Sequence, residues 1–220
     1  MTGVLAGRRV LVTRERPGEL AAMLEALGAE VIHVPLIRVV DTTDGELERH
    51  LAHLADFDWV VVTSAAGAQR VAGAVAATPG VSVAAVGTAT AATLHDRSGR
   101  AVDLVPQRQR AEALVEAFSA AAVTPQRILV AQGDRAPDTL QTGLRRLGHD
   151  VTTVTAYLTE LQPPSPGIVE RADALLLASG SAAMAWAATV GGATPTIPTP
   201  PIVVSIGPTT TAVAEQSGLK

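Results

Sequence analysis

Short apolar runs, each ended by glycine or a small polar residue, alternate along the chain with segments that have the spacing of amphipathic helices. The run Ile202–Ile206 shows this pattern most clearly. Its β-branched and nearly continuous apolar character predicts a strand covered on both faces. Gly207 and Pro208 end the strand, and proline suits the first turn of a helix. The segment therefore predicts a strand, a tight turn and a helix N-terminus.

The same alternation extends along the whole chain. We expect strands at Val10–Thr13, Glu30–Val34, Trp59–Val62 and Val102–Val105, and helices from Pro17 to Leu27, from Ala68 to about Ala76 and over Ala111–Ala122. Ile128–Val130 and Asp173–Ser179 repeat the segments of the first and third of these strands. Because each helix follows a strand, the pattern predicts an α/β protein with doubly wound parallel sheets.

The sequence also repeats itself. The matching segments are Val10–Val12 with Ile128–Val130, Asp58–Ser64 with Asp173–Ser179, and Val83–Ala91 with the stretch that begins at Ile202. The second copy stops before any counterpart of the expected strand Val102–Val105 and its following helix. The duplication therefore predicts two lobes, one of which lacks its last strand and helix.

The composition excludes several classes of function. The formal net charge is −4 and there is no run of basic residues, which argues against a nucleic-acid partner. The chain contains no cysteine, so thiolate catalysis, disulfides and cysteine-ligated metals are excluded. Lys220 is the only lysine, which disfavours Schiff-base, pyridoxal phosphate and P-loop chemistry. His50 and His53 lack a third ligand, so we expect a solvent-facing helix surface there and no metal site.

No segment has the features of a signal peptide or a membrane span. The N-terminal residues carry arginines within their apolar run, which a signal peptide does not. The uncharged segment Ala174–Val190 is interrupted by Ser179, Gly180 and Ser181, which divide it into a strand and a helix. We therefore expect a cytoplasmic protein without a membrane partner.

The order and spacing of these segments resemble the uroporphyrinogen-III synthase family over nearly the whole chain. The segments that carry the resemblance are Val10–Arg14 before the Pro17 helix, Val62–Ala65, Val86–Ala91, Gly133, Tyr157 after Val154, and Ile206–Thr210. The resemblance implies two α/β lobes joined by two extended connectors, with the chain crossing out and back. One lobe would comprise residues 1–35 and 162–220, the other residues 37–155, and the connectors would lie near residues 36–40 and 156–161.

The resemblance also implies a reaction. Members of this family close hydroxymethylbilane, a chain of four pyrroles bearing eight carboxylates, into a ring in tetrapyrrole biosynthesis. The last pyrrole is inverted, by way of what is regarded as a spirocyclic intermediate, and water is lost, so the enzyme is a hydro-lyase. We expect no cofactor, no metal and a monomer. Tyr157 matches the family's catalytic tyrosine, whose phenol is protonated at pH 7 and would help the hydroxide to leave.

A protein with a net negative charge must attract such a polyanion locally. Helix N-termini at the carboxyl ends of parallel strands present N–H groups with partial positive charge, and two facing lobes would place about six of them around a cleft. The expected substrate-binding residues are Thr13, Arg14, Thr63, Ser64, Ala65, Gly87, Thr88, Thr90, Gly133, Asp134, Ser179, Gly180, Ser181, Gly207, Thr209 and Thr210. Their hydroxyls also suit helix capping, and Thr90 also suits a bond to its own helix, so these alternatives stay open.

Two other functions are alternatives at this point. The glycine turns also suit a nucleotide or sugar-phosphate site, although the dinucleotide glycine fingerprint and the P-loop lysine are missing. The same fold would also serve as a catalytically inactive tetrapyrrole-binding or regulatory module. Formation of isomer III from hydroxymethylbilane would separate the synthase from both.

Overall fold

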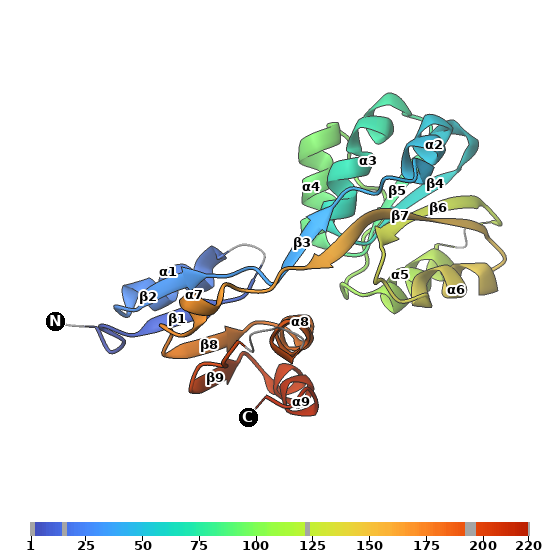
Figure 1. Ribbon diagram of the computed structural model, residues 1–220. Coiled ribbons are helices and arrows are strands. Elements are labelled where there is room, and N and C mark those ends of the chain that lie inside the picture. The colour runs from blue at the N-terminus through green and yellow to red at the C-terminus, as the bar shows by residue number, and fades with distance from the viewer. Residues whose placement is uncertain (1–2, 15–16, 122–123, 192–196, 220) are drawn as a thin grey trace. The chain divides into compact units, whose positions relative to one another are not determined.

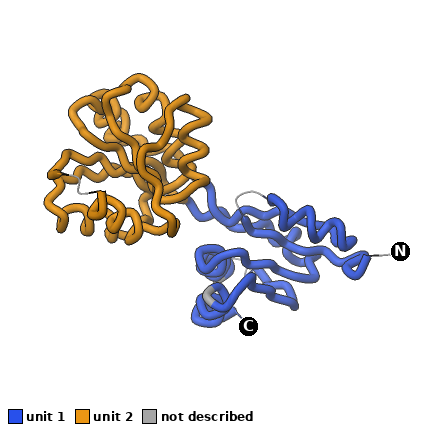
Figure 2. The backbone as a smooth tube through the Cα atoms, turned by 180° about the vertical axis from the view of Figure 1, so that it is seen from behind, with its two compact units in different colours: residues 1–38, 160–220 blue, residues 39–159 orange. Residues whose placement is uncertain are grey.

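A computed structural model of the protein describes residues 3–14, 17–121, 124–191 and 197–219, except for the side chain of Thr209. The chain divides into two compact units, which Figure 2 shows in different colours. Unit 1 consists of residues 1–38 and 160–220, and unit 2 of residues 39–159. The chain therefore leaves unit 1, forms the whole of unit 2 and then returns.

Unit 1 is built on a four-stranded sheet with the order β2-β1-β8-β9, whose neighbouring strands are all parallel (Figure 1). Its elements are β1 (Arg9–Val12), α1 (Gly18–Ala26), β2 (Glu30–His33), α7 (Pro166–Val169), β8 (Ala174–Leu177), α8 (Gly180–Gly191), β9 (Ile202–Ser205) and α9 (Pro208–Gln216). Leu175 packs with Trp186 of α8 on one face of the sheet. The next residue, Leu176, packs with the cluster that includes Leu24 of α1 on the other face.

Unit 2 is built on a five-stranded sheet with the order β3-β7-β6-β4-β5, in which β7, β6, β4 and β5 are parallel. Its elements are β3 (Ile37–Val40), α2 (Glu46–Ala52), the 3-10 turn η1 (Leu54–Asp56), β4 (Trp59–Val62), α3 (Ala65–Ala77), β5 (Ser82–Ala85), α4 (Thr88–Ser98), α5 (Ala111–Ala120), β6 (Arg127–Gly133), α6 (Thr139–Arg146) and β7 (Asp150–Leu161). Val62 packs with Val71 of α3, whereas Val61 packs with Leu114 of α5 on the opposite face. Helices lie on both faces of each sheet, so the predicted doubly wound α/β fold is confirmed.

The two units repeat one plan, because the strand order β7-β6-β4-β5 corresponds to β2-β1-β8-β9. An aspartate occupies the same place in both. Asp58, just before β4, accepts a hydrogen bond from the backbone N–H of Arg127 at 2.7 Å. Asp173, just before β8, accepts one from the backbone N–H of Arg9 at 2.8 Å. The sequence duplication therefore reappears as matching contacts at the start of matching strands.

Two strands carry the chain across the boundary between the units. β3 and β7 are neighbours in the sheet of unit 2, and each runs past the boundary residue. The segments predicted as connectors, residues 36–40 and 156–161, fall largely within these strands. Arg38 and Glu160 form an ion pair with an N–O distance of 2.7 Å where the strands enter unit 1.

The prediction that Ile202–Ile206 is covered on both faces is wrong. Ile202, Val204 and Ile206 are 53%, 44% and 60% exposed, because β9 is the edge of its sheet. In the matching strand β5, Val83, Ala84 and Ala85 are fully buried, since Leu104 forms a parallel bridge to Ala84 and α5 packs over the same cluster. Among the described residues of unit 1, no segment takes the place of Leu104 and α5.

Other predicted bounds also differ from the structure: Ile128–Val130, for example, is part of the longer strand Arg127–Gly133. The expected strand Val102–Val105 is reduced to the single bridge at Leu104. The helix expected from Ala68 begins at Ala65, because Ser64 caps it. The helix expected over Ala111–Ala122 ends at Ala120, and residue 122 lies outside the described residues.

The uncharged segment Ala174–Val190 forms β8 and most of α8, as the Ser179–Ser181 interruption predicted. Within the described part of the chain, no helix combines the length and the apolar character that a membrane span requires.

Candidate functional site

The predicted binding residues lie where parallel strands end in both units. In unit 1 they follow β1, β8 and β9, and in unit 2 they follow β4, β5 and β6. Because neighbouring strands are parallel, these loops all lie at the carboxyl ends of the strands, where open α/β folds bind ligands. Helices α8, α9, α3 and α4 begin in these loops and direct the N–H groups of their first turns toward these strand ends. The predicted cleft between the two lobes stays a prediction.

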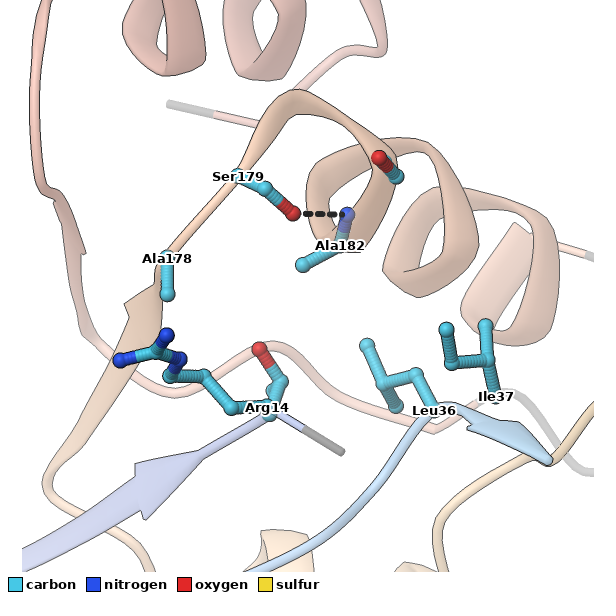
Figure 3. Close-up of a pocket in the computed structure, with 8 residues that line it drawn as sticks. Arg14, Leu36, Ile37, Ala178, Ser179 and Ala182 are labelled. Carbon is cyan, nitrogen blue, oxygen red and sulfur yellow. Dashed lines mark hydrogen bonds between the residues drawn. The ribbon is translucent and has the colours of Figure 1, made fainter. Parts of the chain in front are cut away.

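A pocket of about 230 Å³ lies at the carboxyl ends of the strands of unit 1. Its lining residues are Thr13, Arg14, Leu36, Ile37, Ala178, Ser179, Ser181 and Ala182, most of which Figure 3 labels. Three segments meet there: the end of β1, the first turn of α8 with the residues before it, and the start of β3 with the residue before it. Leu36 and Ile37 form an apolar wall, and the other two segments bring the polar groups, so the pocket suits an anion with an apolar stem.

The polar side chains of this pocket differ in what they leave available. The Ser179 hydroxyl accepts a hydrogen bond from the backbone N–H of Ala182 at 3.1 Å, which caps α8 (Figure 3). Thr13 is 3% exposed and donates to the carbonyl of Leu176 at 3.2 Å. Arg14 is exposed, and its guanidinium extends along the pocket below Ala178 in Figure 3. Arg14 and the first N–H groups of α8 are therefore the groups best placed to meet a carboxylate.

The other unit 1 candidates lie where α8 packs on α9. A Cβ on Gly180 would be 3.1 Å from Cγ2 of Val213, so this glycine permits close contact between the helices. Thr210 is buried in the first turn of α9. Gly207 precedes Pro208 at the start of that helix. The side chain of Thr209 lies outside the described residues.

In unit 2, α3 begins directly after β4. The Ser64 hydroxyl accepts a hydrogen bond from the backbone N–H of Gly67 at 3.1 Å, and Thr63 and Ala65 flank it, half-buried. A Cβ on Gly67 would be 3.3 Å from Val62 Cγ1 and 3.6 Å from the carbonyl oxygen of Ala131. The first turn of α3 thus packs on the ends of β4 and β6.

The N-terminus of α4 is already occupied by a side chain. Gln109 Oε1 accepts a hydrogen bond from the backbone N–H of Thr88 at 3.3 Å and fills the space beside Gly87. Thr90, one turn further, is buried. Sequence reasoning missed Gln109, because a glutamine in a distant loop carries no local signal of capping.

Three candidates of unit 2 meet in one cluster. Gly133 at the end of β6 is the register partner of Tyr157 on β7, at an irregularity in the strand pairing. Asp134 holds the β7 backbone: its N–H donates to the Tyr157 carbonyl at 3.1 Å, and its Oδ1 accepts from the N–H of Thr159 at 2.9 Å. The Tyr157 ring is half-buried, and no described residue forms a hydrogen bond with its hydroxyl. The phenol is therefore free to donate to a ligand.

Arg70 of α3 also belongs to this cluster, although the sequence did not single it out. Its guanidinium carbon lies 5.4 Å from the centre of the Tyr157 ring. Its Nε donates to Asp41 Oδ1 at 2.8 Å, and its Nη1 donates to the carbonyl of Ala66 at 2.9 Å. An arginine on a helix resembles a solvent-facing residue in the sequence, so only the fold reveals its neighbour.

The described residues contain no group of three or more His, Cys, Asp or Glu side chains that would hold a metal. The buried His149 lies at the opposite, amino-terminal ends of the strands of unit 2, just before β7. There its Nδ1 accepts a hydrogen bond from the backbone N–H of Gln126 at 3.2 Å. Burial lowers the pKa of His149, because the imidazolium form would lose its hydration. This histidine is remote from the strand ends that carry the candidate residues.

Comparison with known proteins matches the chain to one family. The family model described as Uroporphyrinogen-III synthase HemD matches residues 18–220. The uroporphyrinogen-III synthase of Synechococcus elongatus is 33% identical over 165 residues, which cover 70% of this chain and 61% of that protein. The chloroplastic uroporphyrinogen-III synthase of Oryza sativa subsp. japonica is 28% identical over 224 residues, which cover 96% of this chain and 73% of that protein.

Solved structures show the same fold. A mutant uroporphyrinogen III synthase from Thermus thermophilus has a TM-score of 0.59 at 18% identity, over 98% of this chain and 90% of that one. The uroporphyrinogen-III synthetase of Helicobacter pylori has a TM-score of 0.60 at 15% identity, over 96% of this chain and 89% of that one. With the family match over residues 18–220, these likenesses lead to one conclusion: the chain belongs to the uroporphyrinogen-III synthase family.

Proposed function

We propose that this protein is a uroporphyrinogen-III synthase, which closes hydroxymethylbilane with inversion of the last pyrrole and loss of water. The observation that carries the proposal is the family match over residues 18–220. The site chemistry agrees with it, since the phenol of Tyr157 lies among strand ends and helix N-termini that suit a polyanion. We further propose a cytoplasmic monomer without cofactor or metal, with lobes at residues 1–35 with 162–220 and at residues 37–155.

Binding must overcome the net charge of −4, which repels a substrate with eight carboxylates. In unit 1, we assign one carboxylate to the pocket that contains Arg14 and the first turn of α8. A guanidinium and backbone N–H groups form charge-assisted hydrogen bonds with a carboxylate. The apolar wall of Leu36 and Ile37 would contact the carbon chain that carries it.

The chemical role falls to Tyr157. Its hydroxyl can donate a hydrogen bond and, among the described residues, has no hydrogen-bond partner. A donor at this point stabilises the hydroxyl group as it departs. Hydroxide leaves the terminal methylene, and the pyrrole carbon that carries the existing bridge attacks that methylene to give the spirocyclic intermediate. The bond to the old bridge then breaks, and the unsubstituted carbon of the inverted pyrrole bonds to the bridge carbon and loses its proton, so the overall change is the loss of one water. No covalent nucleophile takes part, which agrees with a chain that has no cysteine and whose one lysine is Lys220.

An isomer assay tests the proposal. Hydroxymethylbilane is supplied to the protein, and the oxidised products are resolved as isomers I and III. We expect an excess of isomer III, and we expect Tyr157→Phe to lower turnover by at least about tenfold with little change in stability. Isomer I alone would refute the synthase and leave a tetrapyrrole-binding module. Normal turnover of Tyr157→Phe would remove the role of the hydroxyl.

A further inference from the structure

The ring of Tyr157 occupies the space above Gly133. A Cβ added to Gly133 would lie 2.6 Å from Cζ, 2.7 Å from Cε2 and 2.8 Å from the hydroxyl oxygen of that ring. These distances are far shorter than a normal contact between carbon atoms. The hydroxyl end of the ring therefore rests on bare backbone, and only glycine at position 133 permits that placement.

Arg70 fixes the same ring from α3. Its guanidinium lies over the ring face at 5.4 Å from the centre, within the range of a cation–π interaction. Two other groups hold the guanidinium: Asp41 accepts from its Nε at 2.8 Å, and the carbonyl of Ala66 accepts from its Nη1 at 2.9 Å. The Arg70 side chain is only 19% exposed. A planar cation fixed in this way gives the ring a defined surface to lie against.

We propose that Arg70, held by Asp41, is a positioning residue that sets the direction of the Tyr157 phenol. The inference rests on the proposed function, because it concerns the group that meets the leaving hydroxyl. The guanidinium engages the ring face and makes no hydrogen bond to the hydroxyl among the described residues. Arg70 thus restricts the ring while the hydroxyl stays available to the substrate.

A purely structural role is the competing explanation, since Arg70 also links α3 to the residue after β3. The Asp41 side chain is 82% exposed, and an ion pair with an exposed partner contributes little to stability. The two explanations therefore predict different results. Positioning predicts a loss of turnover larger than the loss of stability, whereas a structural link predicts the reverse.

The test combines Arg70→Met with Tyr157→Phe in a double-mutant cycle. Arg70→Met removes the charge but keeps an apolar stem. We expect it to lower kcat by about tenfold, with KM within about twofold of the wild type and a nearly unchanged urea midpoint. In the Tyr157→Phe background, the same change should lower kcat by less than about twofold, because the hydroxyl it orients is gone. Arg70→Lys should recover part of the loss.

A spectroscopic measurement tests the geometry without the reaction. Tyr157 is the only tyrosine in the chain, so a protein with isotope-labelled tyrosine rings gives the NMR signals of this ring alone. Arg70→Met and Asp41→Asn should both shift these signals. Arg49→Met is the matched control, because Arg49 pairs with Glu46 on the surface of α2. That change should leave both the signals and kcat as they are.

Three results would overturn the positioning role. These are unshifted ring signals in Arg70→Met, an equal loss of kcat with and without the Tyr157 hydroxyl, and a loss of kcat fully explained by unfolding. If the wild-type protein forms only isomer I, the proposed function fails. The NMR comparison then still decides whether Arg70 orients the ring.

Discussion

Gly133→Ala gives the most direct test of how the Tyr157 ring is placed. The substitution adds one methyl group at the end of β6, where three atoms of the ring lie 2.6–2.8 Å from its calculated position. The backbone of β6 is paired with β7 as far as Gly133 and with β4 as far as Ala131, two residues before it. The strand is therefore held on both sides close to this position, so the ring must give way.

The size of the effect follows from these distances. Carbon atoms pack at about 3.5–4.0 Å, so the ring must move by about 1 Å. Overpacking of this kind costs about 1–3 kcal/mol of folding stability. A displacement of about 1 Å in a reacting group lowers the rate by about 100-fold. We therefore expect Gly133→Ala to lower turnover by about 100-fold, whereas a stability loss of about 1–3 kcal/mol leaves most of the protein folded.

The assay pairs steady-state turnover of hydroxymethylbilane with urea unfolding. Gly73→Ala is the matched control, because Gly73 lies within α3 and a Cβ there would meet no atom within 4 Å. Alanine is the better helix former, so this control should gain about 0.5–1 kcal/mol and keep its turnover. Wild-type turnover in Gly133→Ala, together with unchanged ring signals of Tyr157, would refute the placement of the ring above Gly133.

Three further outcomes are expected. Ser64→Ala and Ser179→Ala each remove the acceptor that caps a helix and should each cost about 1 kcal/mol in urea unfolding, and no loss would contradict capping. Burial lowers the pKa of His149, so the unfolded chain binds a proton at this histidine more readily than the folded chain does. The stability that neutral His149 allows is therefore complete above about pH 6.5, the pKa of an unfolded histidine, and is lost as the pH falls toward the lowered pKa of the folded state. The urea midpoint followed from about pH 7.5 to 5 should show this slope, and His149→Gln should flatten it. Val204→Lys should lower the free energy of unfolding by less than about 1 kcal/mol, and Val203→Lys by several times more, because only Val203 packs with the apolar cluster under α8 and α9. Equal losses would contradict the alternation of exposed and packed residues along β9.

The sequence predicted individual elements well where local chemistry decides them. The strand Trp59–Val62 was predicted with its observed bounds, because a continuous apolar run lies between Asp58 and Thr63. Ser64 and Ser179 also cap their helices, as the alternative interpretation of those hydroxyls held. In both cases the signal lies within a few neighbouring residues.

The sequence failed where a distant segment decides the outcome. A β-branched run such as Ile202–Ile206 looks the same at the centre and at the edge of a sheet, and its exposure depends on whether another segment lies beside it. The cap that Gln109 supplies to α4 and the contact of Arg70 with Tyr157 likewise join residues that only the fold brings together. Local patterns thus identified the turns of the site but not the side chains that arrive from elsewhere.

The crossing of the chain out of unit 1 and back has a consequence for biosynthesis on the ribosome. Unit 2 is one continuous segment, residues 39–159, and can fold as soon as it has emerged. β1, in contrast, pairs with β8, whose Leu176 is translated 164 residues after Val12. β1 is therefore made well before its sheet is complete, and until β8 emerges its apolar residues depend on β2 and α1.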